Sequence, residues 1–236
     1  DGDIVLHGSL GQELRSVRSN QGNVELFLDA DLQEVTAHRG NVTIHGSLTA
    51  QSVHGKTIEV AGSVHADGLY GGTIRVEGSL RSKSVNAMEG GIHIGGDANV
   101  ENEIVADGGD IAIDGRATAT SIVANDGQII VRGRTSAKKL EAGSNIVMHG
   151  VCDVQDVAAG GQIEIFADIE ARSVRGDWVR VEAPQVRIGL VEGRAAIASS
   201  RAGRTSRGAR SHSGFTIRPS PLPPPALRAR SPSISS

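Results

Sequence analysis

Apolar and polar residues alternate over short stretches that recur along most of the chain. Each stretch holds two apolar β-forming residues one position apart, and the pairs recur every 16 to 20 residues. They are Ile4/Leu6, Val24/Leu26, Val42/Ile44, Ile58/Val60, Ile74/Val76, Ile92/Ile94, Ile111/Ile113, Ile129/Val131, Ile146/Met148, Ile163/Ile165 and Val179/Val181. Alternation over a few positions places every second side chain on one face of a strand and does not fit the period of a helix. The pattern predicts an all-β chain of short, regularly spaced strands.

A second apolar cluster follows each pair, as in Leu48, Ala50 and Val53. The combined unit reads G-x-I-x-V-x-G-S-L-x-A-x-x-V and is plainest over residues 40–80. Glycine, Asn and Asp between the apolar stretches are typical of turns. The chain is therefore an internal repeat, and each repeat is expected to be one structural unit.

Repeats of this length predict a single-stranded right-handed parallel β-helix (a β-solenoid) of about eleven coils. Sandwiches place turn signals every 8–12 residues, which is closer than the spacing found here. Stacked coils lie about 4.8 Å apart, so eleven would form a rod on the order of 50 Å long. Glycine is expected at corners that need a positive φ or close approach of two backbones. The alternative is an open antiparallel sandwich.

Composition agrees with a narrow interior filled by stacked aliphatic side chains. Aromatic residues make up only 2% of the 236 residues, whereas there are 31 glycines. The net charge is -3, but residues 1–193 alone carry 16 basic and 27 acidic residues, a net -11. An acidic body is poorly suited to nucleic acid, so no specific nucleic-acid partner is expected. No apolar run approaches the ~20 residues of a membrane helix, so no transmembrane segment is expected.

The last part of the chain differs in composition from the repeats. Residues 194–236 hold eight Arg, no Asp or Glu, and six of the seven prolines. Such a segment buries too little apolar surface to order itself. We therefore expect a solenoid over 1–193 and a disordered tail over 194–236. The tail either binds an anionic partner through its arginines or is passive.

The two ends of a solenoid expose unpaired backbone groups, which need a cap or another chain. At the C-terminal end the repeat weakens through Trp178 and Pro184. These two residues are the candidate C-terminal cap, with 183–193 as a cap or final irregular coil. At the other end the repeat is already present at Ile4, so either coils precede it or that edge is open for assembly.

Two outward-facing columns of side chains are candidate sites. The first contains His7, His45 and His149, with other residue types expected between them, which favours solvated positions over a metal or pH-sensing ladder. The second is the middle residue of each strand pair. It holds three consecutive apolar residues, Ala112, Ile130 and Val147, which form the candidate association surface, unless a tail or loop covers them.

No constellation of reactive side chains is found, so no catalytic, cofactor or metal site is expected. Asp107, Asp110 and Asp114 lie near glycines, but the tandem nonapeptide of calcium-binding repeats is absent, which favours turn acids. Cys152, the only cysteine, occupies a repeat position usually filled by Ala or Leu and is expected in the core. The metalloprotease, nucleophile-elbow, phosphate-loop and dinucleotide motifs are all absent from the sequence.

The segment GSLTAQSVHGKTIEVAGSVHADGL, with its V-x-G-x-L/V-x-A-x-x-V unit, resembles the bactofilins over about residues 40–180. That resemblance implies a polymer-forming cytoskeletal protein with a right-handed triangular β-solenoid between disordered tails. The solenoid predicted here is longer than a typical bactofilin core. Starts such as GNVEL and GDIAI are similar to a putative-adhesin family, and GGTIRVEG is similar to filamentous-haemagglutinin-type repeats. All three share the architecture and differ in location and partner.

These observations favour a non-enzymatic structural scaffold that forms homo-oligomers or polymers. The alternatives are a surface adhesin or glycan-binding solenoid and, more remotely, a polysaccharide-active β-helix enzyme. A cytoplasmic location is expected over the cell surface.

Overall fold

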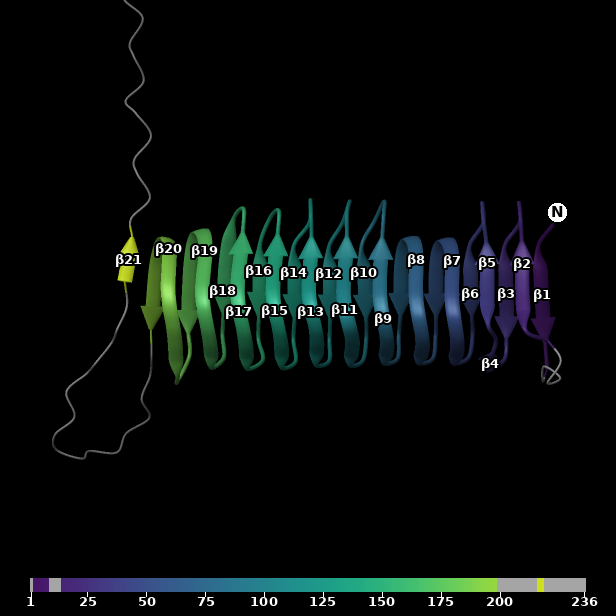
Figure 1. Cartoon of the computed structure of the whole chain (residues 1–236), viewed down its shortest axis with the longest axis horizontal. Helices are drawn as coiled ribbons and strands as arrows, with labels where there is room; N and C mark the ends of the chain where they lie inside the picture. The colour runs from purple at the N-terminus through teal and green to yellow at the C-terminus, as the bar shows by residue number, and fades with distance from the viewer. Residues whose placement is uncertain (1, 9–13, 199–215, 219–236) are drawn as a thin grey trace, which may run out of the picture.

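All-parallel strand pairing organises the chain into a β-solenoid. The computed structural model describes residues 2–8, 14–198 and 216–218, and these contain strands and turns but no helix. Every strand pairs in parallel with the equivalent strand one coil earlier or later, over about eleven coils (Figure 1). The predicted solenoid is confirmed, and the antiparallel sandwich is wrong because successive strand pairs run in the same direction.

The strands fall into three groups by position in the coil. The I-x-V pairs form β1 (Ile4–His7), β3 (Val24–Phe27), β6 (Val42–Ile44), β10 (Ile92–Ile94), β12 (Ile111–Ile113), β14 (Ile129–Val131), β16 (Ile146–Met148) and β18 (Gln162–Ile165). The second apolar clusters form β2 (Ser16–Ser19), β4 (Ala30–Asp31), β5 (Glu34–Ala37), β9 (Leu80–Ala87), β11 (Ala98–Ala106), β13 (Ala117–Ala124), β15 (Thr135–Ala142) and β17 (Cys152–Ala159). Strands that turn corners without a break are β7 (Leu48–Val60), β8 (Val64–Val76), β19 (Ile169–Glu182) and β20 (Val186–Ala198), and β21 (Thr216–Arg218) lies apart in the sequence.

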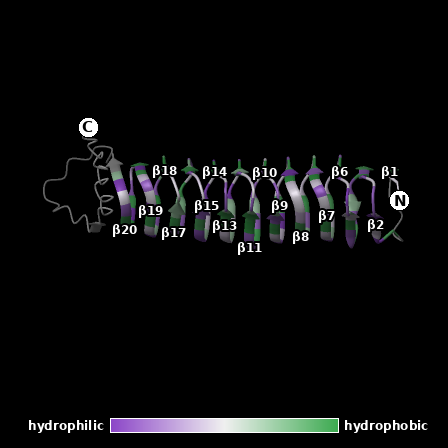
Figure 2. Ribbon diagram, turned by 90° about the horizontal axis from the view of Figure 1, so that it is seen from above, coloured by the Kyte–Doolittle hydropathy of each residue, from purple (hydrophilic) through white to green (hydrophobic). Residues whose placement is uncertain are grey.

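Breaks in the burial pattern mark three corners and hence three faces per coil. Along β7, buried Leu48 and Ala50 are two residues apart, whereas the next buried side chain, Val53, is three residues on. Ile58 and Val60 are the next buried pair. We call the strip of Ile58 and its equivalents face 1, that of Leu48 face 2 and that of Val53 face 3. Hydropathy alternates along the strands of each coil (Figure 2).

Stacked aliphatic side chains make up the core. On face 1, Ile92, Ile111, Ile129 and Ile146 follow one another in register, with 2% or less of each exposed. Each such side chain packs on its equivalents above and below, so stability comes from contacts between neighbouring coils. Large aromatic side chains do not fit this interior, which accounts for their scarcity.

Glycine permits close approach of successive backbones at one corner. Gly46, Gly62, Gly78 and Gly96 follow one another there, and Gly78 N donates to Gly62 O at 3.1 Å. A Cβ on Gly78 would lie 2.6 Å from that carbonyl oxygen. Among the described residues only Gly8 and Gly193 have a positive φ, so of the two expected reasons for glycine at the corners, close approach of two backbones applies to most of them. Close packing of backbones is the main reason for the glycines.

Short polar side chains join the coils at two other rows of corner positions. Asp29 Oδ1 accepts a hydrogen bond from Ser47 N at 2.6 Å, and Ser47 Oγ in turn accepts one from Ser63 N. Before face 1, Asp3 Oδ1 accepts from Asn23 N, and Asn23 Oδ1 accepts from Asn41 N at 2.8 Å. These ladders satisfy backbone donors that the turns leave outside the strands. They explain the Asn, Asp and Ser at the start of the repeat.

Candidate assembly surfaces

The predicted apolar column lies on the outside of face 1. Ala112 pairs in register with Ile130, and Ile130 with Val147, in three consecutive coils. All three side chains are half-buried, and no other segment among the described residues covers them as a separate layer. The sequence therefore placed these residues together correctly, and their use as an association surface stays a prediction.

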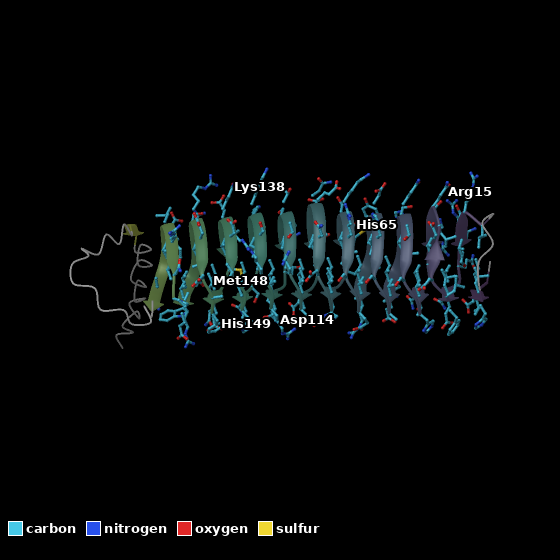
Figure 3. The ribbon with its side chains drawn as sticks, turned by 90° about the horizontal axis from the view of Figure 1, so that it is seen from below. Arg15, His65, Asp114, Lys138, Met148 and His149 are labelled. Carbon is cyan, nitrogen blue, oxygen red and sulfur yellow. The ribbon has the colours of Figure 1, made fainter. Side chains whose placement is uncertain are left out.

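Aromatic residues enlarge this column toward the C-terminal end. His149, two residues after Val147, stacks on Phe166 with ring centroids 5.3 Å apart. Arg180 lies over the Phe166 ring at 5.8 Å and reaches Glu164 at 3.6 Å. We call Ala112, Ile130, Val147, His149 and Phe166 the lateral patch. Figure 3 shows His149 on the same side of the rod as Asp114, with Lys138 and His65 on the opposite side.

A second aromatic stack lies on the first coils and was missed by the sequence interpretation. His7 stacks on Phe27 at 4.5 Å between centroids, and Phe27 stacks on His45 at 4.1 Å. His45 Nε2 also lies 2.9 Å from Glu25 Oε1. The three histidines are exposed, as predicted. The prediction did not recognise that the residue between His7 and His45 is Phe27, which stacks on both rings. Extending each strand pair by one residue would have revealed the stack.

Face 3 carries an outward column that the sequence interpretation did not single out. His54 stacks on Tyr70 with centroids 5.0 Å apart, and further along Val105 pairs in register with Val123. Little in the sequence indicated this column, because each coil has only one large, fully buried residue on face 3 and the alternation there is short. This column is less continuous than the lateral patch.

In the outward column of face 1, Glu and Arg lie side by side in register at two positions, and a cross-coil ion pair forms at one of them. Arg180 reaches Glu164. Arg75 instead pairs with Glu77 of its own coil, although Glu59 lies beside it in register. Exposed pairs of this kind contribute at most about 1 kcal/mol. These exposed ion pairs therefore add little to the free energy of folding.

The three aspartates near glycines each contact the following coil. Asp107 Oδ1 accepts a hydrogen bond from Asn125 Nδ2 at 2.7 Å, and Asp110 Oδ1 accepts one from Gln128 N at 2.9 Å. Asp114 pairs with Arg132. Within the described residues, no cluster of three His, Cys, Asp or Glu side chains is arranged to hold a metal ion. Their observed contacts are those of turn residues.

Cys152 lies in the core, on face 2 between the register positions of Thr135 and Ile169. Only 1% of the residue is exposed, and its Sγ lies 3.0 Å from Gly150 O. Burial raises the pKa of the thiol to about 12. A thiol that holds its proton is a poor nucleophile, so the geometry agrees with a packing role.

A pH titration of stability is expected to report this burial. The thiol of the unfolded chain loses its proton near the ordinary cysteine pKa of 9.0, whereas the pKa of the folded thiol is about 12. The native state then binds more protons between these values, so its stability falls as pH rises, by about 1.4 kcal/mol per unit. Urea unfolding of wild type and Cys152→Ala between pH 8 and 10.5 measures the difference. Parallel pH profiles for the two proteins would contradict the assignment.

Both ends of the described solenoid have half-exposed core positions. Ile4 and Leu6 in β1 are partly buried, whereas Val24 and Leu26 in the next coil are fully buried. At the other end Ala195 in β20 is again only partly buried. In the described part of the chain, β1 and β2 have strand partners on one side only. Among the described residues, the core positions of these end coils have a neighbouring coil on one side only.

The predicted C-terminal cap is not at the end of the solenoid. Trp178 lies in β19, pairs in register with Arg194 of β20 and is 39% exposed. Pro184 is an exposed residue in the turn between β19 and β20. The ladder resumes after it because proline removes only one donor, and β20 runs as a regular coil past Gly193 to Ala198. The expected disordered tail lies outside the described residues except for 194–198 and 216–218.

Comparisons with known proteins give no relative on which to base an identity. The chain matches no protein-family model, no curated protein and no solved structure. Among the residues described by the structure, none belongs to a helix with the length and apolar character needed to cross a membrane.

Proposed function

We propose that the chain is a non-enzymatic structural scaffold that assembles end to end through the edges of its solenoid. The observation that carries the proposal is the continuity of the core columns. Within the described residues the face 1 column runs in register from Ile4 through Val179 to Ala195, since each coil pairs with the next. A first coil placed on the last coil of another copy therefore meets apolar positions in the same columns.

Backbone hydrogen bonding supports the same contact. An edge strand presents a row of unpaired N–H and C=O groups, which another strand can satisfy. The edge strand at the N-terminal end is four residues long on face 1, and the matching stretch of β20 runs over Arg194–Ala198. Joining them would continue the parallel ladder without changing its direction. Assembly by this route gives a rod with the same cross-section as the single chain.

The lateral patch offers a second contact between rods. It lies on one side of the solenoid, away from both ends, and combines three aliphatic residues with Phe166 and His149. Apolar residues grouped on an exposed face mark surfaces that are buried in assemblies. End-to-end growth and side-by-side packing are thus separable, because they use different residues.

Two aspartate substitutions in the full chain are expected to separate these contacts. Leu6→Asp places a charge in the joining core column and is expected to reduce end-to-end association at least tenfold, a loss of about 1.4 kcal/mol. Ile130→Asp is expected to leave rod length unchanged and to prevent lateral pairing. Sedimentation velocity over a concentration series and negative-stain microscopy measure both effects.

The matched control is Thr118→Asp, which adds the same charge to the outward side of face 2, between the neutral residues Asn99 and Ser136 and on a different face from the lateral patch. It is expected to behave as wild type, and circular dichroism checks that all variants keep their β content. A wild-type chain that stays monomeric at the highest soluble concentration would contradict the proposed function.

A second candidate function is glycan binding by a surface solenoid. Exposed aromatic rings favour it, namely Phe27 at 42% and Trp178 at 39% exposure, because an apolar ring with a wet edge suits a binding surface. A glycan array probed with the full chain tests this candidate. Binding that is lost in Trp178→Ala, with no assembly of the wild type, would favour it over the scaffold.

A further inference from the structure

The C-terminal edge of the solenoid is partly occupied by a strand from the chain's own tail. β21 (Thr216–Arg218) pairs in parallel with the face 3 stretch of β20, with Leu190 opposite Thr216, Val191 opposite Ile217 and Glu192 opposite Arg218 (Figure 1). Within the described residues, the stretches of β20 on faces 1 and 2 have no strand beyond them. In the part of the chain that the structure describes, a further strand therefore covers only one of the three faces at this end.

The register places β21 in the same three columns as β2 (Ser16–Ser19), at the opposite end. Successive pairings connect Ser16 through Glu34, Ser52 and the later coils to Leu190, and then to Thr216. The neighbouring columns likewise connect Val17 to Ile217 and Arg18 to Arg218.

The residue types of the two strands agree column by column. β2 reads Ser-Val-Arg and β21 reads Thr-Ile-Arg, so each has a hydroxyl residue, a β-branched apolar residue and an arginine in the same order. The middle column points inward, since Val17 and Val191 are both buried. Val191, which has Ile217 beyond it, is 1% exposed, whereas Ala195 in the same coil has no partner beyond it among the described residues and is half-buried.

The third column contains Arg18 in the first coil, Glu192 in the last coil and Arg218 in β21. Its charges favour an arginine next to Glu192. In the first coils Arg18 has Thr36 beside it in the third column, and its Nη2 donates to Glu34 Oε1 of the first column at 2.8 Å, which lowers the pKa of the Glu34 carboxyl. At the last coil Arg175 pairs with Glu192. The residue beyond Glu192 in this column is Arg218 of β21, and in an end-to-end assembly it would be Arg18 of the next copy. The register therefore sets an arginine position beside Glu192 in either arrangement.

We propose that β21 is an intramolecular cap that imitates β2 and occupies the place on the last coil that the first coil of a second copy takes in assembly. The inference rests on the proposed end-to-end scaffold, to which it adds a control element. The next residue in the sequence is Pro219, which has no backbone N–H to donate to a further coil, whereas the equivalent residue of β2 is Ser19, which pairs in register with Ala37. The tail strand closes face 3 without extending the rod.

Competition between the two strands sets the concentration at which the chain assembles. A copy whose cap is in place has the face 3 edge of β20 occupied, so the apparent affinity falls in proportion to the fraction of uncapped chains. With about one chain in ten uncapped, removal of the cap would lower the assembly concentration about tenfold.

The test compares three full-length proteins: wild type, Thr216→Pro and Thr205→Pro. In the column of Thr216 the backbone N–H of Glu34 and of Ser52 donates to the preceding coil, so the N–H of Thr216 is the donor that faces β20. Thr216→Pro removes that donor, whereas Thr205→Pro makes the same change elsewhere in the tail. Sedimentation velocity over a concentration series is expected to show Thr216→Pro assembling at about one tenth of the wild-type concentration. Thr205→Pro is expected to match wild type. Amide hydrogen exchange at residue 218 is expected to be slow in dilute wild type and fast in Thr216→Pro.

A second disruption keeps the backbone donor in place. Arg218→Glu sets two acidic residues in register at the edge and is also expected to lower the assembly concentration. If wild type assembles and both variants match it, the cap is refuted while the scaffold stands. If no protein assembles at any concentration, the scaffold and the cap are refuted together. Fast exchange at the amides of 216 and 218 in dilute wild type would also refute the cap.

Discussion

Gly78→Ala is expected to lower the free energy of unfolding by about 3 kcal/mol, because the new methyl group has no room. Its Cβ would lie 2.6 Å from Gly62 O, in the row of glycines where coils exchange backbone hydrogen bonds. To make space the two backbones must move apart, which weakens the bond from Gly78 N to Gly62 O. Since φ at Gly78 is not positive, the cost comes from packing and not from backbone strain.

Urea unfolding followed by circular dichroism measures this loss. The matched control is Glu77→Ala, which changes the neighbouring residue and removes only its exposed pair with Arg75. That control is expected to cost less than about 1 kcal/mol. Equal stability of Gly78→Ala and wild type would mean that successive coils are not packed as closely as the structure shows.

Ile111→Ala is expected to destabilise the chain by about 2–5 kcal/mol, because it opens a cavity in the middle of the stacked core. Ile111 is fully buried and lies in register between Ile92 and Ile129. The surrounding coils are held by their ladders and cannot collapse freely into the space. The same substitution at Ile4, in the same column but at the end, is expected to cost roughly 1 kcal/mol because Ile4 is only partly buried.

Denaturant unfolding with hydrogen exchange distinguishes the two variants. In a solenoid each coil contacts only its neighbours, so the central change is expected to expose amides on both sides of it. The change at Ile4 is expected to affect only amides of the first coils. If both substitutions cost the same, the end coil would have to be as well packed as the centre, contrary to the burial found here.

The strand positions could be read from the sequence because they depend on local pattern alone. Every I-x-V pair predicted from alternation is buried on face 1, from Ile58/Val60 to Ile163/Ile165. Alternation reports which side chains point inward, and this holds for each strand whatever lies beside it. The position of Ala112 beside Ile130 followed in the same way, since equivalent positions of a regular repeat must stack.

Contacts that depend on residues outside the repeat unit were not predicted. The spacing of 16 to 20 residues is absorbed at corners: β7 passes from face 3 to face 1 without a break, whereas a turn separates β9 from β10. In β11 an irregularity between Val100 and Glu103 takes up additional residues. The repeat alone does not say where such residues sit, so the place of Phe27 between two histidines was overlooked.

The sequence by itself determined the strands, the inward residues and the order of the columns along the rod. The tertiary structure decided how the ends are made: Trp178 lies within a coil and not over it, and β20 continues the ladder past Pro184. It also decided that a tail strand and β2 share three columns, although about 200 residues separate them. Alternation reflects the local environment of each strand, whereas pairing at an edge depends on backbone groups left free when the whole solenoid is built.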